Sequence, residues 1–135
     1  VDSVTNYTGT IISETTPEKY KDLMTSAEAS QLKTYMEGVV SYGTGSVLSG
    51  QSYSVAGKTG TAQEDRSRSN HAFFVSFAPY SNPEIAVTVN IPYGYAGTNA
   101  ASLGKQIYEY YYGYTSFEEI VGSGALSASN SSVEE

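Results

Sequence analysis

The residues with the clearest potential for chemistry are four consecutive ones: Lys58, Thr59, Gly60 and Thr61. A lysine supplies a fixed positive charge that attracts a carboxylate. If the segment is a strand, side-chain alternation puts Thr59 and Thr61 on one side, where both hydroxyls can bind that carboxylate. Gly60 has no side chain, so a second backbone can lie alongside. The backbone N–H of Thr61 can then act as one donor of an oxyanion hole.

The string Gly57-Lys58-Thr59 also allows a phosphate-binding interpretation, because a P-loop ends in the same residue types. That loop needs a glycine five residues before Gly57, where this sequence has Ser52. It also needs a helix directly afterwards, and the following TAQEDRSRSN is not typical of one. We therefore expect no nucleotide site.

The composition excludes several other classes of site. The 135 residues include 7 basic and 14 acidic side chains, one histidine and no cysteine, which gives a formal net charge of −7. Thiolate catalysis, cysteine-ligated zinc and disulfides are excluded, and a histidine-rich metal site is too. The few basic residues are scattered, so nucleic acid is not an expected partner. No apolar run is long enough to cross a bilayer, and we expect a soluble chain without cofactor or metal.

Hydrophobic periodicity and turn signals predict an α+β fold, with an antiparallel sheet of three consecutive strands flanked by two helices. The strands are expected over residues 54–63, 71–79 and 84–92, a further short strand over 10–13, and the helices over 26–42 and 99–112. Residues 116–135 are rich in Ser, Gly, Ala and Glu, and this composition predicts a disordered tail after one ordered unit over residues 1–115.

Four blocks around the lysine motif occur in one order with short gaps: MEGVVSYGTG, VAGKTGTAQ, HAFFVSFAP and EIAVTVNI. Together they resemble the C-terminal part of the transpeptidase domain of penicillin-binding proteins, most closely the class B branch, over about residues 10–112. The resemblance implies a β-lactamase/transpeptidase-like fold. It also implies a D,D-transpeptidase that cross-links peptidoglycan stem peptides ending in D-Ala-D-Ala through an acyl-serine, and that β-lactams acylate.

The resemblance assigns roles to the four motif residues. Lys58 becomes the motif lysine that lies near the family's middle serine motif. Thr59, Gly60 and Thr61 become the substrate-binding wall, with both threonine hydroxyls on the substrate or antibiotic carboxylate. The backbone N–H of Thr61 completes the oxyanion hole.

The other two motifs of the family are not found in place. An S-x-x-K string does occur at Ser30–Lys33, but the pattern around it predicts a surface helix, and no S-x-N triplet occurs. We therefore expect the nucleophile to lie in a missing N-terminal part and this chain alone to be inactive. The intact protein is expected in the bacterial cytoplasmic membrane with this part outside. Separated from that part, the sheet is expected to expose an apolar face, which favours dimerisation or partial disorder.

Two alternative functions are also compatible with this sequence. One is a β-lactam sensor or serine β-lactamase of the same fold, and another is a non-catalytic module whose tyrosines bind cell-wall sugars. His71 is expected to be structural or merely exposed, and Glu64 and Asp65 are expected to belong to a solvated turn. The loops at residues 43–53 and 93–99 are expected to border the substrate cleft.

Overall fold

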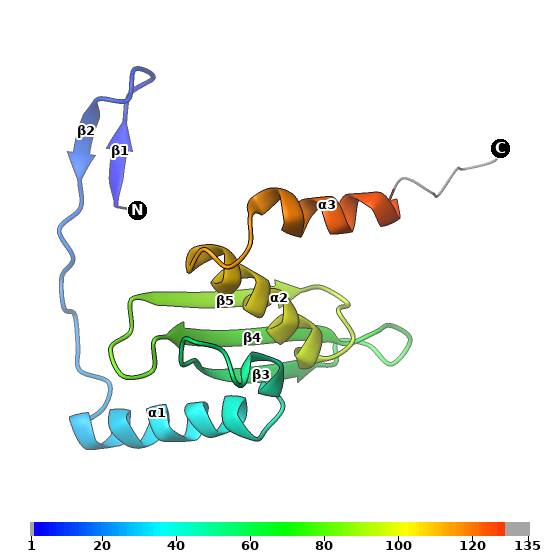
Figure 1. The fold of residues 1–135 in the computed structure, drawn as a ribbon. Coiled ribbons are helices and arrows are strands. Elements are labelled where there is room, and N and C mark those ends of the chain that lie inside the picture. The colour runs from blue at the N-terminus through cyan, green and yellow to red at the C-terminus, as the bar shows by residue number, and fades with distance from the viewer. Residues whose placement is uncertain (1, 129–135) are drawn as a thin grey trace.

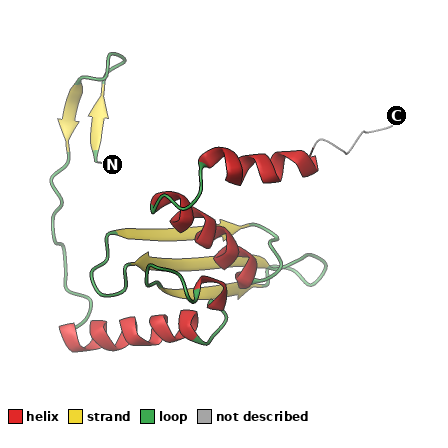
Figure 2. Ribbon diagram, in the orientation of Figure 1, coloured by secondary structure: helices red, strands yellow, loops and turns green. Residues whose placement is uncertain are grey.

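A computed structural model describes residues 2–128 of the chain, with side chains described up to residue 122. The elements follow one another as β1 (Ser3–Thr5), β2 (Ile11–Glu14), α1 (Ser26–Ser41), the short 3-10 helix η1 (Ser46–Leu48), β3 (Ala56–Ala62), β4 (His71–Ala78), β5 (Ile85–Ile91), α2 (Gly97–Tyr111) and α3 (Phe117–Ala128). The strands β3, β4 and β5 are consecutive, with helices before and after them, as in an α+β fold (Figure 2);.

The centre of the fold is a three-stranded antiparallel sheet with the strand order β3-β4-β5. Fully buried residues alternate with less buried ones along β4, so one face of the sheet carries the core; the buried row is Ala72, Phe74, Ser76 and Ala78. The predicted α+β fold with three consecutive strands is confirmed. The strand that carries Lys58, β3, lies at an edge of this sheet.

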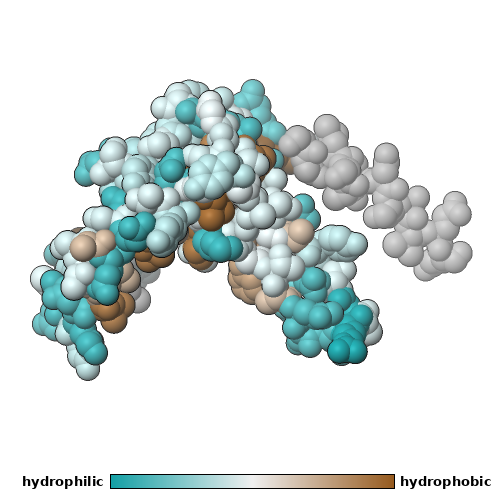
Figure 3. All heavy atoms as spheres, turned by 90° about the horizontal axis from the view of Figure 1, so that it is seen from below, coloured by the Kyte–Doolittle hydropathy of each residue, from teal (hydrophilic) through white to brown (hydrophobic). Residues whose placement is uncertain are grey.

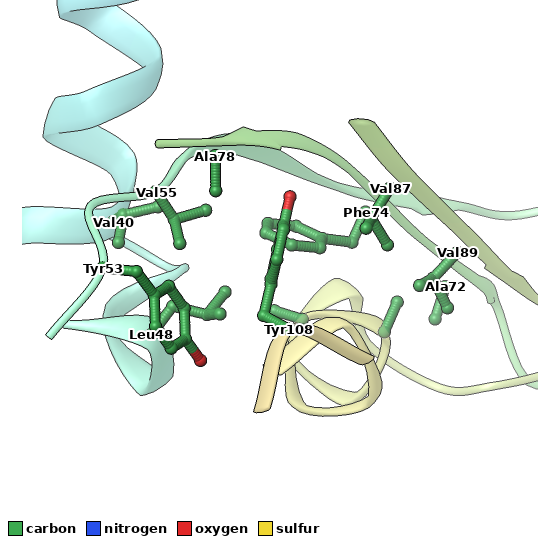
Figure 4. Packing of buried hydrophobic residues seen from close by; sticks show 12 residues of the cluster. Val40, Leu48, Tyr53, Val55, Ala72, Phe74, Ala78, Val87, Val89 and Tyr108 are labelled. Atoms are coloured by element: carbon green, nitrogen blue, oxygen red, sulfur yellow. The ribbon is translucent and has the colours of Figure 1, made fainter. Parts of the chain in front are cut away.

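Helix α2 covers the buried face of the sheet, and Tyr108 is the largest side chain between them (Figure 4). Its ring is fully buried, and its hydroxyl donates a hydrogen bond of 2.9 Å to Ser76, which in turn donates to the carbonyl of Val87. A glycine on α2 allows the close approach, since a Cβ at Gly104 would lie 2.8 Å from a ring carbon of Phe74. The helix therefore fixes the sheet from one side.

Helix α1 lies along β3 (Figure 1). It begins with a capping box: the Glu28 backbone N–H donates to the Thr25 hydroxyl, and the Glu28 carboxylate accepts from the Thr25 backbone. The backbone N–H and the hydroxyl of Thr25 both donate to this carboxylate and lower the pKa of Glu28. A capping box satisfies N–H groups that the first turn leaves free, so the start of α1 is fixed locally.

The first two strands form a separate hairpin that stands away from the main sheet (Figure 1). Its turn is organised by Asn6, whose side-chain oxygen accepts hydrogen bonds of 2.9 Å from the backbone of Thr8 and of Thr10. The sequence predicts the second strand of this pair but not β1, which is only 3 residues long. Every residue of β2 is exposed.

The prediction of a disordered tail is wrong for residues 117–128, which form α3. The signal that outweighs the polar composition is a second capping box: the Glu119 backbone donates to the Ser116 hydroxyl, and the Glu119 carboxylate accepts from the Ser116 backbone at 2.8 Å;. The rest of that predicted tail, residues 129–135, lies outside the described residues. No helix in the described part of the chain has the length and hydrophobicity that a bilayer crossing demands.

Two buried tyrosines make the stability of this fold sensitive to alkaline pH. Burial raises the pKa of Tyr53 and of Tyr108 to about 12. A raised folded-state pKa means that the stabilisation is complete below the ordinary tyrosine value of about 10 and is lost as pH rises through about 12. We expect the free energy of unfolding, measured by urea titration, to fall across this interval. The Y108F variant should show a smaller fall, and an equal fall would contradict the prediction.

Candidate active site

Lys58 lies in the middle of β3, on the side facing away from the α2 core. Its ammonium group donates a hydrogen bond of 2.6 Å to the carbonyl of Thr59. The neighbouring surface is apolar: a cavity of about 270 Å³ is lined by Lys58, Val75 and four residues of α1, namely Leu32, Tyr35, Met36 and Val39. In Figure 3 brown, hydrophobic side chains are visible on the face of the molecule where α1 lies. A charged group thus stands at an apolar and largely uncovered surface.

The two threonines of the motif project from the other face of β3. Thr59 is 9% exposed, and its hydroxyl lies 2.5 Å from the hydroxyl of Thr44. The hydroxyl of Thr61 accepts a hydrogen bond of 3.1 Å from the backbone N–H of Gly97, the first residue of α2. Two hydroxyls two residues apart are therefore held in fixed positions, one by the loop after α1 and the other by the start of α2.

The start of α2 approaches β3 without an intervening side chain. A Cβ placed on Gly97 would lie 2.7 Å from the carbonyl oxygen of Gly60 and 3.0 Å from the Cβ of Thr59. Backbone atoms cannot move aside as a flexible side chain can. Glycine at this position therefore sets the separation between the helix and the motif strand.

We expect a G97A substitution to force β3 and α2 apart, because the new methyl group meets backbone. Overpacking of this kind costs about 1–3 kcal/mol of unfolding free energy. The matched control is G122A in α3, where a new Cβ has no heavy atom within 4 Å. Urea unfolding of the protein should show the loss for G97A and no loss for G122A. Equal stability of the two variants would contradict the close approach.

The sequence patterns do not single out Thr44 or Gly97, although both residues lie in the predicted loops, 43–53 and 93–99, that are expected to border the substrate cleft. The Thr44 contact spans 15 positions and the Gly97 contact spans 36. A glycine at the start of a predicted helix is the one available signal for Gly97. Nothing in the local sequence points to Thr44.

The S-x-x-K string does not form a nucleophile and base. The Ser30 hydroxyl donates a hydrogen bond of 2.9 Å to the carbonyl of Ser26, one turn earlier in α1. The Lys33 ammonium group lies 5.4 Å from the centre of the Tyr80 ring and 5.9 Å from that of Phe77. Both side chains have local roles on the surface of α1.

His71 joins the end of β3 to the loop before α2. Its Nδ1 accepts a hydrogen bond of 3.2 Å from the backbone N–H of Tyr93, so a neutral ring carries its proton on Nε2, which lies 3.1 Å from the Glu64 carboxylate;. The Tyr93 hydroxyl also donates to Glu64 at 3.3 Å. The sequence provided no partner for His71, and the structure supplies two. Within the described residues no cluster of three His, Asp or Glu side chains suits a metal ion.

Several tyrosines pack together instead of forming a free aromatic surface. The rings of Tyr53 and Tyr112 stack with their centres 4.6 Å apart, and Tyr108 lies 5.8 Å from Tyr53. Tyr110 and Tyr114 remain about half exposed or more, at 53% and 60%. The tyrosines in and directly after α2 thus serve both the core and the surface.

Comparisons with known proteins identify the family of this chain. The family model described as penicillin binding protein transpeptidase domain matches residues 1–109. The chain belongs to this family. It is similar to the peptidoglycan D,D-transpeptidase MrdA of Acinetobacter baumannii, with 34% identity over 95 residues, covering 60% of this chain and 14% of the relative. It is also similar to the stage V sporulation protein D of Bacillus subtilis, with 33% identity over 113 residues, covering 76% of this chain and 17% of the relative.

Solved penicillin-binding protein structures share the fold. The D,D-transpeptidase domain of a peptidoglycan glycosyltransferase from Eggerthella lenta matches with a TM-score of 0.67 and 30% identity, over 80% of this chain and 25% of that one. Penicillin-binding protein A of M. tuberculosis, solved as an imipenem acyl-enzyme complex, matches with a TM-score of 0.63 and 27% identity, over 80% of this chain and 24% of that one. This penicillin-binding protein segment therefore spans about a quarter of such chains and less than a fifth of its curated relatives.

Proposed function

We propose that this chain forms the β3 side of the active site of a serine D,D-transpeptidase, which cross-links peptidoglycan stem peptides ending in D-Ala-D-Ala and is acylated by β-lactams. One observation carries the proposal: an edge strand presents the Lys58 ammonium on one face and the fixed hydroxyls of Thr59 and Thr61 on the other. The family match supports the same function.

The edge position of β3 supports a direct role in substrate binding. An edge strand leaves unpaired backbone groups, to which an extended peptide can add as another strand. In this proposal the carboxylate of the substrate binds the hydroxyls of Thr59 and Thr61, exchanging their present contacts for the ligand. Gly60 leaves room for the substrate backbone, and the Thr61 N–H stabilises the oxyanion as the tetrahedral intermediate forms.

The proposal places the nucleophile outside this chain. The acyl-serine is expected to come from another part of the same transpeptidase domain, which packs on the apolar surface around Lys58. Partial exposure of Leu32, at 45%, and of Val75, at 43%, supports a covering partner there. Lys58 then brings its charge to the serine motifs. We further propose that the intact protein is anchored in the bacterial cytoplasmic membrane with this domain on its outer side.

Covalent labelling with a fluorescent penicillin tests the function. The intact protein that contains this chain is incubated with the probe and analysed by gel and intact mass, beside the 135-residue chain. We expect a stable adduct on the intact protein and none on the chain. Rapid release of the label as hydrolysed penicillin would identify a β-lactamase instead. No adduct at all would leave only the fold in common with the transpeptidases.

A further inference from the structure

The turn between β3 and β4 contains a polar cavity that the proposed function does not use. It measures about 460 Å³ and is lined mainly by residues 66–70, together with Gln63 and Tyr95. Both arginines of the sequence, Arg66 and Arg68, lie in its wall. The cavity wall therefore carries two positive charges and no acidic residue, although the turn as a whole is formally neutral because it also contains Glu64 and Asp65.

The acidic residues of this turn are engaged elsewhere. The Asp65 carboxylate accepts hydrogen bonds of 2.7 Å from both the backbone N–H and the hydroxyl of Ser67, which lower its pKa. The Glu64 carboxylate is bound by His71, as described above. Neither carboxylate is paired with an arginine in the part of the chain that the structure describes. Arg66 and Arg68 therefore form no direct ion pair with the carboxylates of their own turn, although Arg68 and Glu64 both hydrogen-bond to the Tyr93 hydroxyl.

The two arginines differ in how they are held. The guanidinium of Arg68 donates a hydrogen bond of 2.8 Å to the Tyr93 hydroxyl and lies 5.5 Å from the centre of that ring. These two contacts fix its orientation. Arg66 has no hydrogen-bond or ion-pair partner among residues 2–128. A guanidinium binds carboxylate through two parallel N–H groups, and Arg66 retains this capacity.

The cavity lies beyond the C-terminal end of β3, in the direction in which a peptide paired with β3 would extend. Gln63 directly follows β3, and Thr61 is two residues earlier, which corresponds to about 7 Å along a strand;. A peptide that adds antiparallel to β3, with its terminal carboxylate at Thr59 and Thr61, runs with its upstream residues toward the end of β3. Those residues reach the arginine-lined cavity.

We propose that this cavity is an anion subsite, in which Arg66 binds a carboxylate carried by the upstream part of the acyl donor while Arg68 supports the positive potential. The inference rests on the proposed function, because it uses the same strand and the same direction of substrate binding. It adds a preference for donors that carry a negative charge beyond the reacting carbonyl.

The test uses two penicillins that differ only at the far end of the side chain, which bears a carboxylate in one and a carboxamide in the other. The second-order rate constant of acylation is measured for each with the intact transpeptidase. We expect the carboxylate to be preferred by roughly three- to tenfold, as for a partly solvated charge pair. The preference should shrink as the ionic strength rises.

Single substitutions that remove or keep one positive charge test whether Arg66 causes this preference. R66Q should abolish the preference while leaving acylation by the carboxamide unchanged, and R66K should retain part of it. The control K19Q removes an equal charge from an exposed site, with 74% of the Lys19 side chain exposed, and should change nothing. A preference that persists in R66Q, or is absent in the unmodified protein, overturns the subsite. Failure of both penicillins to acylate would instead overturn the proposed function.

Discussion

Under the proposed function, replacement of Lys58 by alanine is expected to slow acylation of the intact protein by about 100- to 1,000-fold, which is the usual effect of removing one electrostatic stabiliser from an active site. The ammonium group is held beside β3 by its 2.6 Å hydrogen bond to the Thr59 carbonyl. Alanine removes the charge without adding bulk. Time courses of labelling with a fluorescent penicillin, at several concentrations, give the rate constant directly.

Lys33 provides the matched control for this experiment, because it belongs to the S-x-x-K string but lies over the rings of Phe77 and Tyr80. The K33A variant should be acylated within about twofold of the unmodified rate, allowing for the loss of a weak cation–π contact. Thermal unfolding of both variants checks that they remain folded. If K33A were as slow as K58A, Lys33 and not Lys58 alone would belong to the active site.

Truncation of Tyr108 to alanine is expected to have the largest effect on stability, with a loss of about 3–5 kcal/mol of unfolding free energy, as is typical of large buried aromatic side chains. The ring is fully buried between α2 and the sheet. The milder Y108F variant removes only the hydroxyl that donates to Ser76 and should cost about 1 kcal/mol;. Urea unfolding measures both losses.

Substitutions of two other tyrosines distinguish the contribution of ring burial from that of the Ser76 hydrogen bond. Tyr110 is on the same helix but is 53% exposed, so Y110A should change stability by no more than about 0.5 kcal/mol;. The buried hydroxyl of Tyr53 has no hydrogen-bond partner in the described structure, so Y53F should not destabilise the protein. A loss in Y53F equal to that in Y108F would show that burial and not the Ser76 hydrogen bond determines the cost.

The three-stranded sheet could be predicted because its signals are local. Alternating apolar residues mark β4 and β5, and the turn residues between them limit the pairing to antiparallel neighbours;. The motif at Lys58 was identifiable because it lies among four sequence blocks that occur in a fixed order with short gaps. These parts of the fold and of the candidate site depend on residues close together in the sequence.

The remaining features depend on contacts that the local pattern does not encode. The Thr44–Thr59 pair and the contact of Gly97 with Gly60 bring together distant segments. Helix α3 was missed for another reason, since its capping box at Ser116 was outweighed by a composition typical of disorder. The Ser-x-x-Glu pattern of that capping box is nevertheless present in the sequence at Ser116–Glu119.

The close approach of Gly97 to Gly60 has a consequence for the evolution of this domain. The motif strand and the helix beside it meet through backbone atoms, which every amino acid shares. Substitutions at this contact can therefore widen the site, but they cannot place a new functional group in it. Under the proposed function, changes in substrate range or antibiotic susceptibility are then expected in the segments bordering the strand. Of these, the loop with Thr44 and the turn with Arg66 offer side chains that can vary without displacing the strand.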